Sequence, residues 1–132
     1  MKNKSKRKKI KQQKTSSFPR EWIYINKKEI EPADFRCLYQ KEEFMDVQIW
    51  KEAGVVEIEL PCGKSMDFEW GEPDLGDVTG NHILDKYQAE TLYYVTIVPE
   101  SYEEARKAME SVVECLGGIF CGDNENFQPY IE

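Results

Sequence analysis

The sequence predicts an α+β fold: an antiparallel β-meander precedes a C-terminal β-α-β unit, and one amphipathic helix packs on one sheet face. Two patterns support this prediction. Residues 45–70 contain runs in which apolar and polar side chains alternate, which is the period of half-buried strands. Residues 92–121 contain an apolar run, an amphipathic helical pattern and a second apolar run. The chain has 132 residues, so we expect one domain with a sheet of about four to five strands.

The N-terminal half of the domain supplies the predicted meander. A first strand is expected at 22–25, and Pro32 favours a short helix within the ambiguous segment 29–43. Three alternating strands are then expected, joined by turns that contain glycine: residues 45–50, 55–60 and 66–70. Short connections that contain glycine are typical of antiparallel hairpins.

The C-terminal third supplies the predicted β-α-β unit. Residues 92–98 are almost continuously apolar, which predicts a strand buried on both faces. The polar segment 71–91 before this strand is expected to be a connection with at most one helical turn, near His82 to Tyr87. Ser101 and Glu104 form a capping-box pattern, so we expect them to begin a helix that ends at two glycines.

A short strand at 119–121 follows this helix. It forms a right-handed crossover if it pairs in parallel with the strand at 92–98. Residues 124–131 are expected to be extended and to pack back onto the domain. The predicted core consists of the apolar residues on the inner sides of these elements: Val56, Ile58, Leu60, Phe68, Trp70, Val95, Ile97, Ala105, Met109, Val112 and Leu116.

Charge divides the chain into two parts. Residues 1–14 hold eight of the 18 basic side chains and no acidic one, so the rest of the chain carries 10 basic and 25 acidic side chains, a net charge of −15. We predict a basic disordered tail at 1–17 and a single α+β domain at 18–132, because like charges without an apolar face cannot form a core. The basic side chains of the tail are Lys2, Lys4, Lys6, Arg7, Lys8, Lys9, Lys11 and Lys14.

The alternation also predicts which side chains share a face of the sheet, because a shift of one residue exchanges the two faces of a strand. For the apolar sides to agree, the first hairpin must pair residue 49 with 56. The second hairpin must pair residue 60 with 66. Both hairpins then direct their apolar side chains toward the same core.

The opposite face of this predicted sheet is acidic. The register places Asp46, Glu59 and Asp67 in one row across the three strands. The next row contains Gln48, Glu57 and Glu69. The predicted partner-binding surface comprises this face and the acidic residues that follow it in the sequence: Asp46, Gln48, Trp50, Glu57, Glu59, Asp67, Glu69, Glu72, Asp74 and Asp77.

Four interpretations of this surface compete. It is either an ordinary solvated face that keeps the protein soluble, or a docking surface that attracts a basic protein partner. A calcium or magnesium site is disfavoured, because a pleated sheet does not wrap oxygen atoms around an ion. A pair of catalytic carboxylates is disfavoured as well, because that chemistry needs a cleft and the spacing indicates none.

The basic tail has its own interpretations. Its charge suits salt-sensitive contact with nucleic acid or the ribosome, although it contains no aromatic residues for base stacking. It lacks the apolar face of a membrane-binding helix, so no membrane partner is expected. The remaining interpretations are a segment that folds back onto the acidic surface and a solubilising arm.

Neither the cysteines nor the histidine forms a catalytic or metal-binding motif. The four cysteines contain no C-x-x-C pair, so we expect no zinc site. Without an export signal we expect four reduced thiols and a cytoplasmic location. His82, with Asp85 three residues later, has no nucleophile motif beside it, and no cofactor is expected.

The leading functional hypothesis is a small acidic cytosolic protein that docks or sequesters a basic macromolecule without catalysis. A toxin-neutralising immunity protein, or antitoxin, is one concrete form, because an acidic inhibitor suits the cationic groove of a nuclease. The alternatives are a nucleic-acid- or ribosome-associated protein that uses the basic tail, and a small enzyme with its active site in the 71–91 loop. No oligomeric state follows from the sequence.

Overall fold

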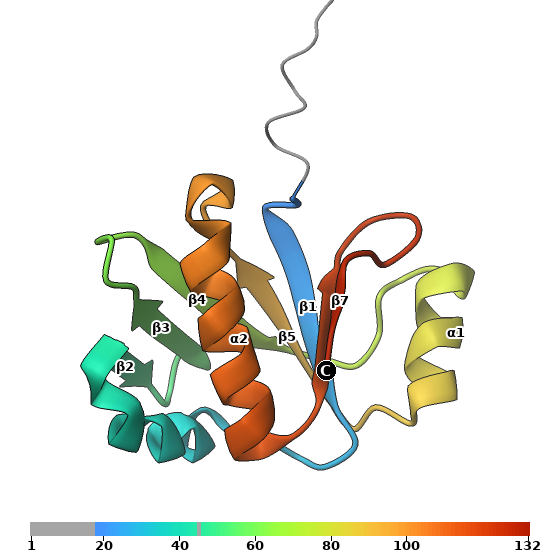
Figure 1. The fold of residues 1–132 in the computed structure, drawn as a ribbon. Coiled ribbons are helices and arrows are strands. Elements are labelled where there is room, and N and C mark those ends of the chain that lie inside the picture. The colour runs from blue at the N-terminus through green and yellow to red at the C-terminus, as the bar shows by residue number, and fades with distance from the viewer. Residues whose placement is uncertain (1–17, 45) are drawn as a thin grey trace, which may run out of the picture.

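The computed structural model describes residues 18–44 and 46–132. Seven strands form one antiparallel sheet in the order β2-β3-β4-β5-β1-β6-β7 (Figure 1). The strands are β1 (Glu21–Asn26), β2 (Asp46–Trp50), β3 (Val55–Glu59), β4 (Ser65–Gly71), β5 (Thr91–Thr96), β6 (Ile119–Gly122) and β7 (Tyr130–Ile131). The helices are the 3-10 helices η2 (Pro32–Phe44) and η3 (Pro99–Ser101) and the α-helices α1 (Val78–Tyr87) and α2 (Tyr102–Leu116). The predicted α+β class with a meander is confirmed, and the sheet is wider than the expected four to five strands because all six predicted strands and the short β7 join it.

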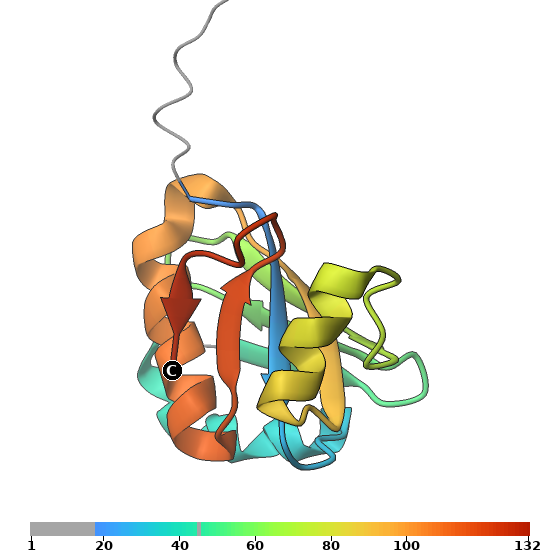
Figure 2. The ribbon, with the colours of Figure 1, turned by 90° about the vertical axis from the view of Figure 1, so that its right-hand side faces the viewer.

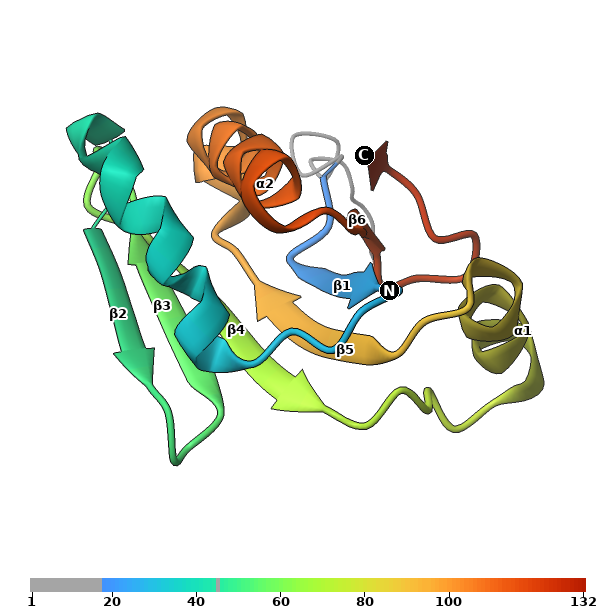
Figure 3. The same cartoon turned by 90° about the horizontal axis from the view of Figure 1, so that it is seen from below.

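The two faces of the sheet have different covers. η2 and α2 pack on one face, here called the front face, and α1 packs on the opposite or back face (Figure 3). α1 lies behind β5, β1 and β6, which we call the closed half of the sheet. Within the described residues no helix covers the back of β2, β3 and β4, which we call the open half (Figure 3).

The front face carries the main core. Inward-facing strand side chains meet Phe35 and Leu38 of η2 and the apolar side of α2. The centre is a cluster of aromatic rings with neighbouring centroids 4.7–6.5 Å apart: Tyr24, Phe35, Phe68, Tyr93 and Phe120. The predicted core residues are buried here, with two exceptions. Trp70 is 36% exposed at the end of β4, and Leu116 is only partly buried.

β1 lies between β5 and β6 and is antiparallel to both. The predicted β-α-β unit is therefore β5-α2-β6 with β1 inserted, so its two strands run parallel without pairing directly. β1 is buried on both faces, because Trp22 and Tyr24 face the front core and Ile23 and Ile25 the back core. The chain enters β6 through Gly118, whose φ is +85° and where a Cβ would collide with the Ile25 carbonyl oxygen.

α1 is longer than the single helical turn that the sequence predicts. Asp77 caps its first turn by accepting a hydrogen bond from the N–H of Gly80 at 2.6 Å. Gln88 ends it in the left-handed conformation. The sequence pattern underestimates this helix because only Gly80 and Leu84 are buried on it.

The predicted capping box of α2 is wrong, although its amphipathic pattern and its end at Gly117 are confirmed. η3 directly precedes α2, so Ser101 does not have the extended backbone that capping requires. The Ser101 hydroxyl donates to the carbonyl of Val98 instead, at 2.8 Å. The Glu104 carboxylate accepts a hydrogen bond of 2.9 Å from the N–H of Cys62, which fastens α2 to the β3–β4 turn.

The expectation of four reduced thiols is also wrong. Cys37 of η2 and Cys115 of α2 form a disulfide, with Cα atoms 6.3 Å apart and a sequence separation of 78. Cys62 and Cys121 are free, the first exposed and the second buried. The disulfide therefore joins the two elements that cover the front face.

The ends of the domain complete the fold. The predicted basic tail at 1–17 and the predicted strand residue Met45 lie outside the described residues. At the other end the chain packs back as predicted: β7 pairs with β6 beside α2, and Ile131 is buried (Figure 2). None of the helices in the described residues combines the length and the apolar character that crossing a bilayer requires.

Candidate docking surface

The hairpin register of the open half decides which side chains share a face. In the first hairpin Ile49 pairs with Val56, as predicted. In the second hairpin Ile58 pairs with Met66, whereas the prediction paired Leu60 with it. The turn is longer than expected, so the register is shifted by two residues. A shift of two keeps every side chain on its predicted face, and the common acidic side of the three strands is confirmed.

The shift changes which carboxylates are neighbours. Asp46 pairs with Glu59, as predicted, but Asp67 pairs with Glu57 and does not stand in the row of Glu59. Directly opposed residues of antiparallel strands have Cβ atoms roughly 4.5–5.5 Å apart. The back of the open half therefore contains two pairs of carboxylates, and the two members of each pair stand directly opposite each other. Each pair opposes sheet formation by up to about 1 kcal/mol.

We call the back of the open half the acidic face. It consists of Asp46, Gln48, Trp50, Val55, Glu57, Glu59, Asp67 and Glu69. The ion pairs in the described part of the chain are Arg20–Glu21 and Arg106–Glu110, and neither involves a residue of this face. Its negative charge is therefore not compensated by an ion pair from the described residues.

The acidic face is an open surface. The sheet curves toward η2 and α2, so the acidic face lies on its outer side (Figure 3). Its carboxylates are exposed except for the half-buried Glu57, and the indole of Trp50 is 46% exposed at one end. An outward-curving surface of this kind suits contact with a macromolecule better than enclosure of an ion or a small substrate.

The acidic face continues into a groove on the closed half. Tyr94 of β5 pairs with Glu69 and so extends the cross-strand row of the acidic face. It lines a groove of about 600 Å³ together with residues from the start of α1 and from the β6–β7 loop: Leu75, Asp77, Thr79, Asp123, Asn124, Glu125 and Phe127. Gly71 makes room for the Tyr94 ring, because a Cβ there would lie 2.9 Å from it.

Tyr94 shows that the groove is electronegative. Burial raises the pKa of its hydroxyl above the ordinary value, and negative charge nearby raises this pKa further. The charges that act on it are the carboxylates of Asp123, Asp74 and Glu69. The ring remains 37% exposed, so a partner on the acidic face can reach it.

The three acidic residues that follow the strands in the sequence lie in different places. Asp77 caps α1 and lines the groove. Asp74 accepts hydrogen bonds from the Asn81 side chain and from a backbone N–H, and these bonds lower its pKa. Glu72 lines a separate hollow of about 470 Å³ together with Glu29 and Trp70, so it does not belong to the acidic face.

Sequence reasoning missed the groove. Tyr94 lies within the apolar run at 92–98 that we expected to be wholly buried. Glu125 and Phe127 lie in the segment 124–131, which we expected to be extended and to pack back onto the domain, and Asp123 directly precedes it. The available signals were a hydroxyl-bearing ring in an otherwise apolar strand and the polar run that contains Asp123 and Glu125.

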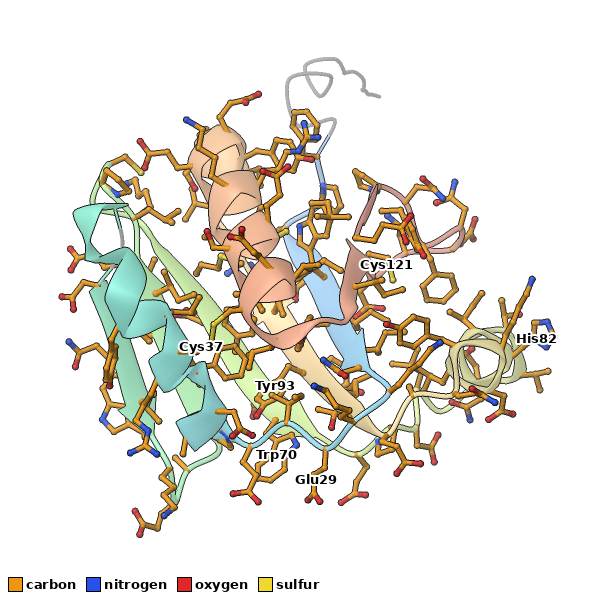
Figure 4. All side chains as sticks on the ribbon, turned by 60° about the horizontal axis from the view of Figure 1, so that its bottom comes forward. Glu29, Cys37, Trp70, His82, Tyr93 and Cys121 are labelled. Carbon is orange, nitrogen blue, oxygen red and sulfur yellow. A yellow bond between two sulfur atoms is a disulfide. The ribbon has the colours of Figure 1, made fainter. Side chains whose placement is uncertain are left out.

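The residues considered for catalysis are not brought together. His82 is exposed on the outer side of α1 and is not among the residues that line the groove (Figure 4). Burial, and secondarily the charge of Asp123, raises the pKa of Cys121 to about 12, so this thiol stays protonated near neutral pH. Across residues 18–44 and 46–132, no group of three or more His, Cys, Asp or Glu side chains is arranged to hold a metal ion.

The chemistry that this surface offers is recognition of cationic groups. Carboxylates accept charge-assisted hydrogen bonds from lysine and arginine side chains. Exposed aromatic rings such as Trp50 and Tyr94 can pack against a guanidinium or ammonium group. Comparison of the chain with protein-family models, with curated proteins and with solved structures finds no match.

Proposed function

We propose that this protein docks or sequesters a basic macromolecule on its acidic face, without catalysis. The observation that carries this proposal is the direct opposition of like charges, Asp46 with Glu59 and Glu57 with Asp67, on a surface that the described residues leave uncovered. Such pairs cost folding free energy, and a cationic partner would remove that cost on binding.

The proposed partner is a basic protein that presents lysine and arginine side chains to the acidic face. Negative potential over a broad face speeds the encounter with such a partner, and Trp50 and Tyr94 supply contact area at its two ends. A toxin-neutralising immunity protein remains the concrete form of this proposal, with the cationic groove of a nuclease as its target.

The test is a triple variant that keeps side-chain size and removes charge: Asp46→Asn, Glu59→Gln and Asp67→Asn. We expect a basic protein from the source cells to bind the wild-type chain at low salt and to be lost from the variant. The matched control neutralises acids on the helices: Asp85→Asn, Glu103→Gln and Glu110→Gln. Equal capture by the triple variant, with folding intact by circular dichroism, would reject the acidic face as the binding site.

A second candidate function is binding of nucleic acid or the ribosome through the basic tail. Eight basic residues without an acid within 1–14 favour it. Replacing the tail lysines by glutamine should abolish RNA binding and should not reduce capture of a basic protein. The enzyme alternative in the 71–91 segment has less support, because His82 does not line the groove beside that segment.

We also propose the cytoplasm as the site of this function. The Cys37–Cys115 disulfide makes the location testable, because stable disulfides are rare in a reducing cytosol. Cell fractionation with a thiol-blocking reagent would report location and redox state together. Recovery of the disulfide form from an oxidising compartment alone would contradict the cytoplasmic location.

A further inference from the structure

The acidic face is opposite in charge to a segment of the same chain. Residues 2–14 contain eight basic side chains and no acidic one, and residues 15–132 carry a net charge of −15. The described chain begins at Phe18, whose ring stacks on Tyr102 at the start of α2, with centroids 3.8 Å apart. The basic segment is thus attached at one end of the sheet.

The attachment point lies within reach of the whole acidic face. Glu21 pairs with Thr96, which pairs with Asp67, which in turn pairs with Glu57. The chain therefore enters β1 in the same cross-strand row as two of the opposed carboxylates. Neighbouring strands are about 4.8 Å apart, so Asp46 on β2 lies about 20 Å from Glu21. An extended chain covers about 3.3 Å per residue, or roughly 50 Å over the residues before Phe18.

The acids of α2 are nearer to Phe18, but they are less suited to bind the segment. Arg106 and Lys107 lie among them, and Arg106 pairs with Glu110 at 3.1 Å. The acidic face has no such pairing in the described part of the chain. A tethered segment also has an effective concentration in the millimolar range, so weak contacts suffice to populate the bound form.

We infer that residues 2–14 occupy the acidic face as an internal ligand and compete there with an external basic partner. This inference rests on the proposed function for its surface, whereas the internal contact itself needs no partner. Binding of a basic partner then displaces the segment and frees its eight basic side chains for a polyanion. Docking of a basic macromolecule and binding of a polyanion by the tail are then coupled, because the first releases the segment that performs the second.

Zero-length carbodiimide cross-linking of the full chain, followed by peptide mapping, tests the contact. At low salt we expect tail lysines to be joined to Glu57, Glu59 and Asp67 about tenfold more often than to Glu103 and Glu110 of α2. The excess should vanish in 1 M NaCl, where the Debye length is about 3 Å. Equal yields on both sets of acids, or an excess that survives high salt, would overturn the inference.

Isotope mixing separates an internal contact from one between two copies. An equal mixture of ¹⁴N- and ¹⁵N-labelled chains should yield cross-linked peptide pairs of one label only. Pairs of mixed label in statistical proportion would show that the segment serves a second copy, and the internal contact would be rejected.

A binding experiment tests the competition, with a poly-lysine peptide as the probe. A full-length variant with five tail positions neutralised (Lys4→Gln, Lys6→Gln, Arg7→Gln, Lys8→Gln and Lys9→Gln) should bind the probe about tenfold more tightly than the wild type. The control, Lys27→Gln with Lys28→Gln, should bind like the wild type. Equal affinity of all three proteins would overturn the competition. Cross-links without capture of any basic protein would leave the internal contact standing and remove the proposed function.

Discussion

The open and closed halves of the sheet share one front core and differ at the back. β5, β1 and β6 bury apolar side chains on both faces, with α1 as the second cover. β2, β3 and β4 bury one face, and on the other they carry five carboxylates. The difference follows strand periodicity: continuous apolar runs make strands with two cores, and alternating runs make strands with one. The acidic face therefore lacks the apolar side chains on which a further core layer would pack.

A disulfide joins η2 and α2, the two helices that cover the front face, and we expect its removal to have the largest effect on stability. Cys37 lies in η2, which contacts β2 and β3 of the open half, and its disulfide partner Cys115 lies in α2. A loop of this length gives roughly 4 kcal/mol of stabilisation in the chain-entropy model. We expect Cys115→Ser to lower the free energy of unfolding by about this amount in urea titration without reductant.

The matched control for the disulfide is Cys62→Ser, which removes an exposed free thiol and should change stability little. Denatured, unreduced wild-type protein should show two reactive thiols, Cys62 and Cys121, whereas the native protein should show only Cys62. Four reactive thiols in the denatured protein would contradict the disulfide.

The next largest effect should come from side-chain truncations on the back face, which should cost more stability in the closed half than in the open half. Leu92 of β5 is fully buried under α1, so Leu92→Ala should cost about 3 kcal/mol of unfolding free energy. Val55 of β3 lies on the same face but is half-buried in the open half, so Val55→Ala should cost about 1 kcal/mol. Chemical denaturation of the two variants and the wild type measures both losses. Equal losses would mean that an apolar layer covers the back of the open half in solution.

The same contrast explains what could be predicted from the sequence. The acidic face was predictable because side-chain parity along a strand depends only on alternation, and it survived a register error of two residues at Met66. The insertion of β1 between β5 and β6 was not predictable, because it depends on pairing between distant segments. The groove was missed for the same reason: Tyr94 and Asp123 lie far apart in sequence and meet only through that insertion.

Removing one of two directly opposed carboxylates should raise the free energy of unfolding, by less than the truncations lower it. In the variant with the five neutralised tail positions, Glu57→Gln leaves Asp67 without a directly opposed like charge, so we expect stabilisation of up to about 1 kcal/mol at low salt. The gain should shrink as salt screens the pair. Glu103→Gln is the control with the same charge change. Glu103 lies in the first turn of α2, where the helix dipole favours negative charge, so its loss should be neutral or slightly destabilising. Identical responses of the two variants would show that only net charge matters.

The smallest expected effect is a change in the pKa of Asp74, which lies beside the groove where the two halves meet. The Asn81 side chain and a backbone N–H lower the pKa of this carboxyl in the folded state. Its stabilising contribution is therefore present above the pKa of the unfolded chain and is lost as the pH falls through the lower folded value. Asn81→Ala should raise the pKa of Asp74 toward its ordinary value, as followed by NMR titration of its carboxyl carbon. Lys86→Gln changes the charge of α1 away from Asp74 and should leave that titration unchanged. An unmoved Asp74 curve in Asn81→Ala would mean that the loop before α1 is not held as described, and the groove wall at Asp77 would then be in doubt as well.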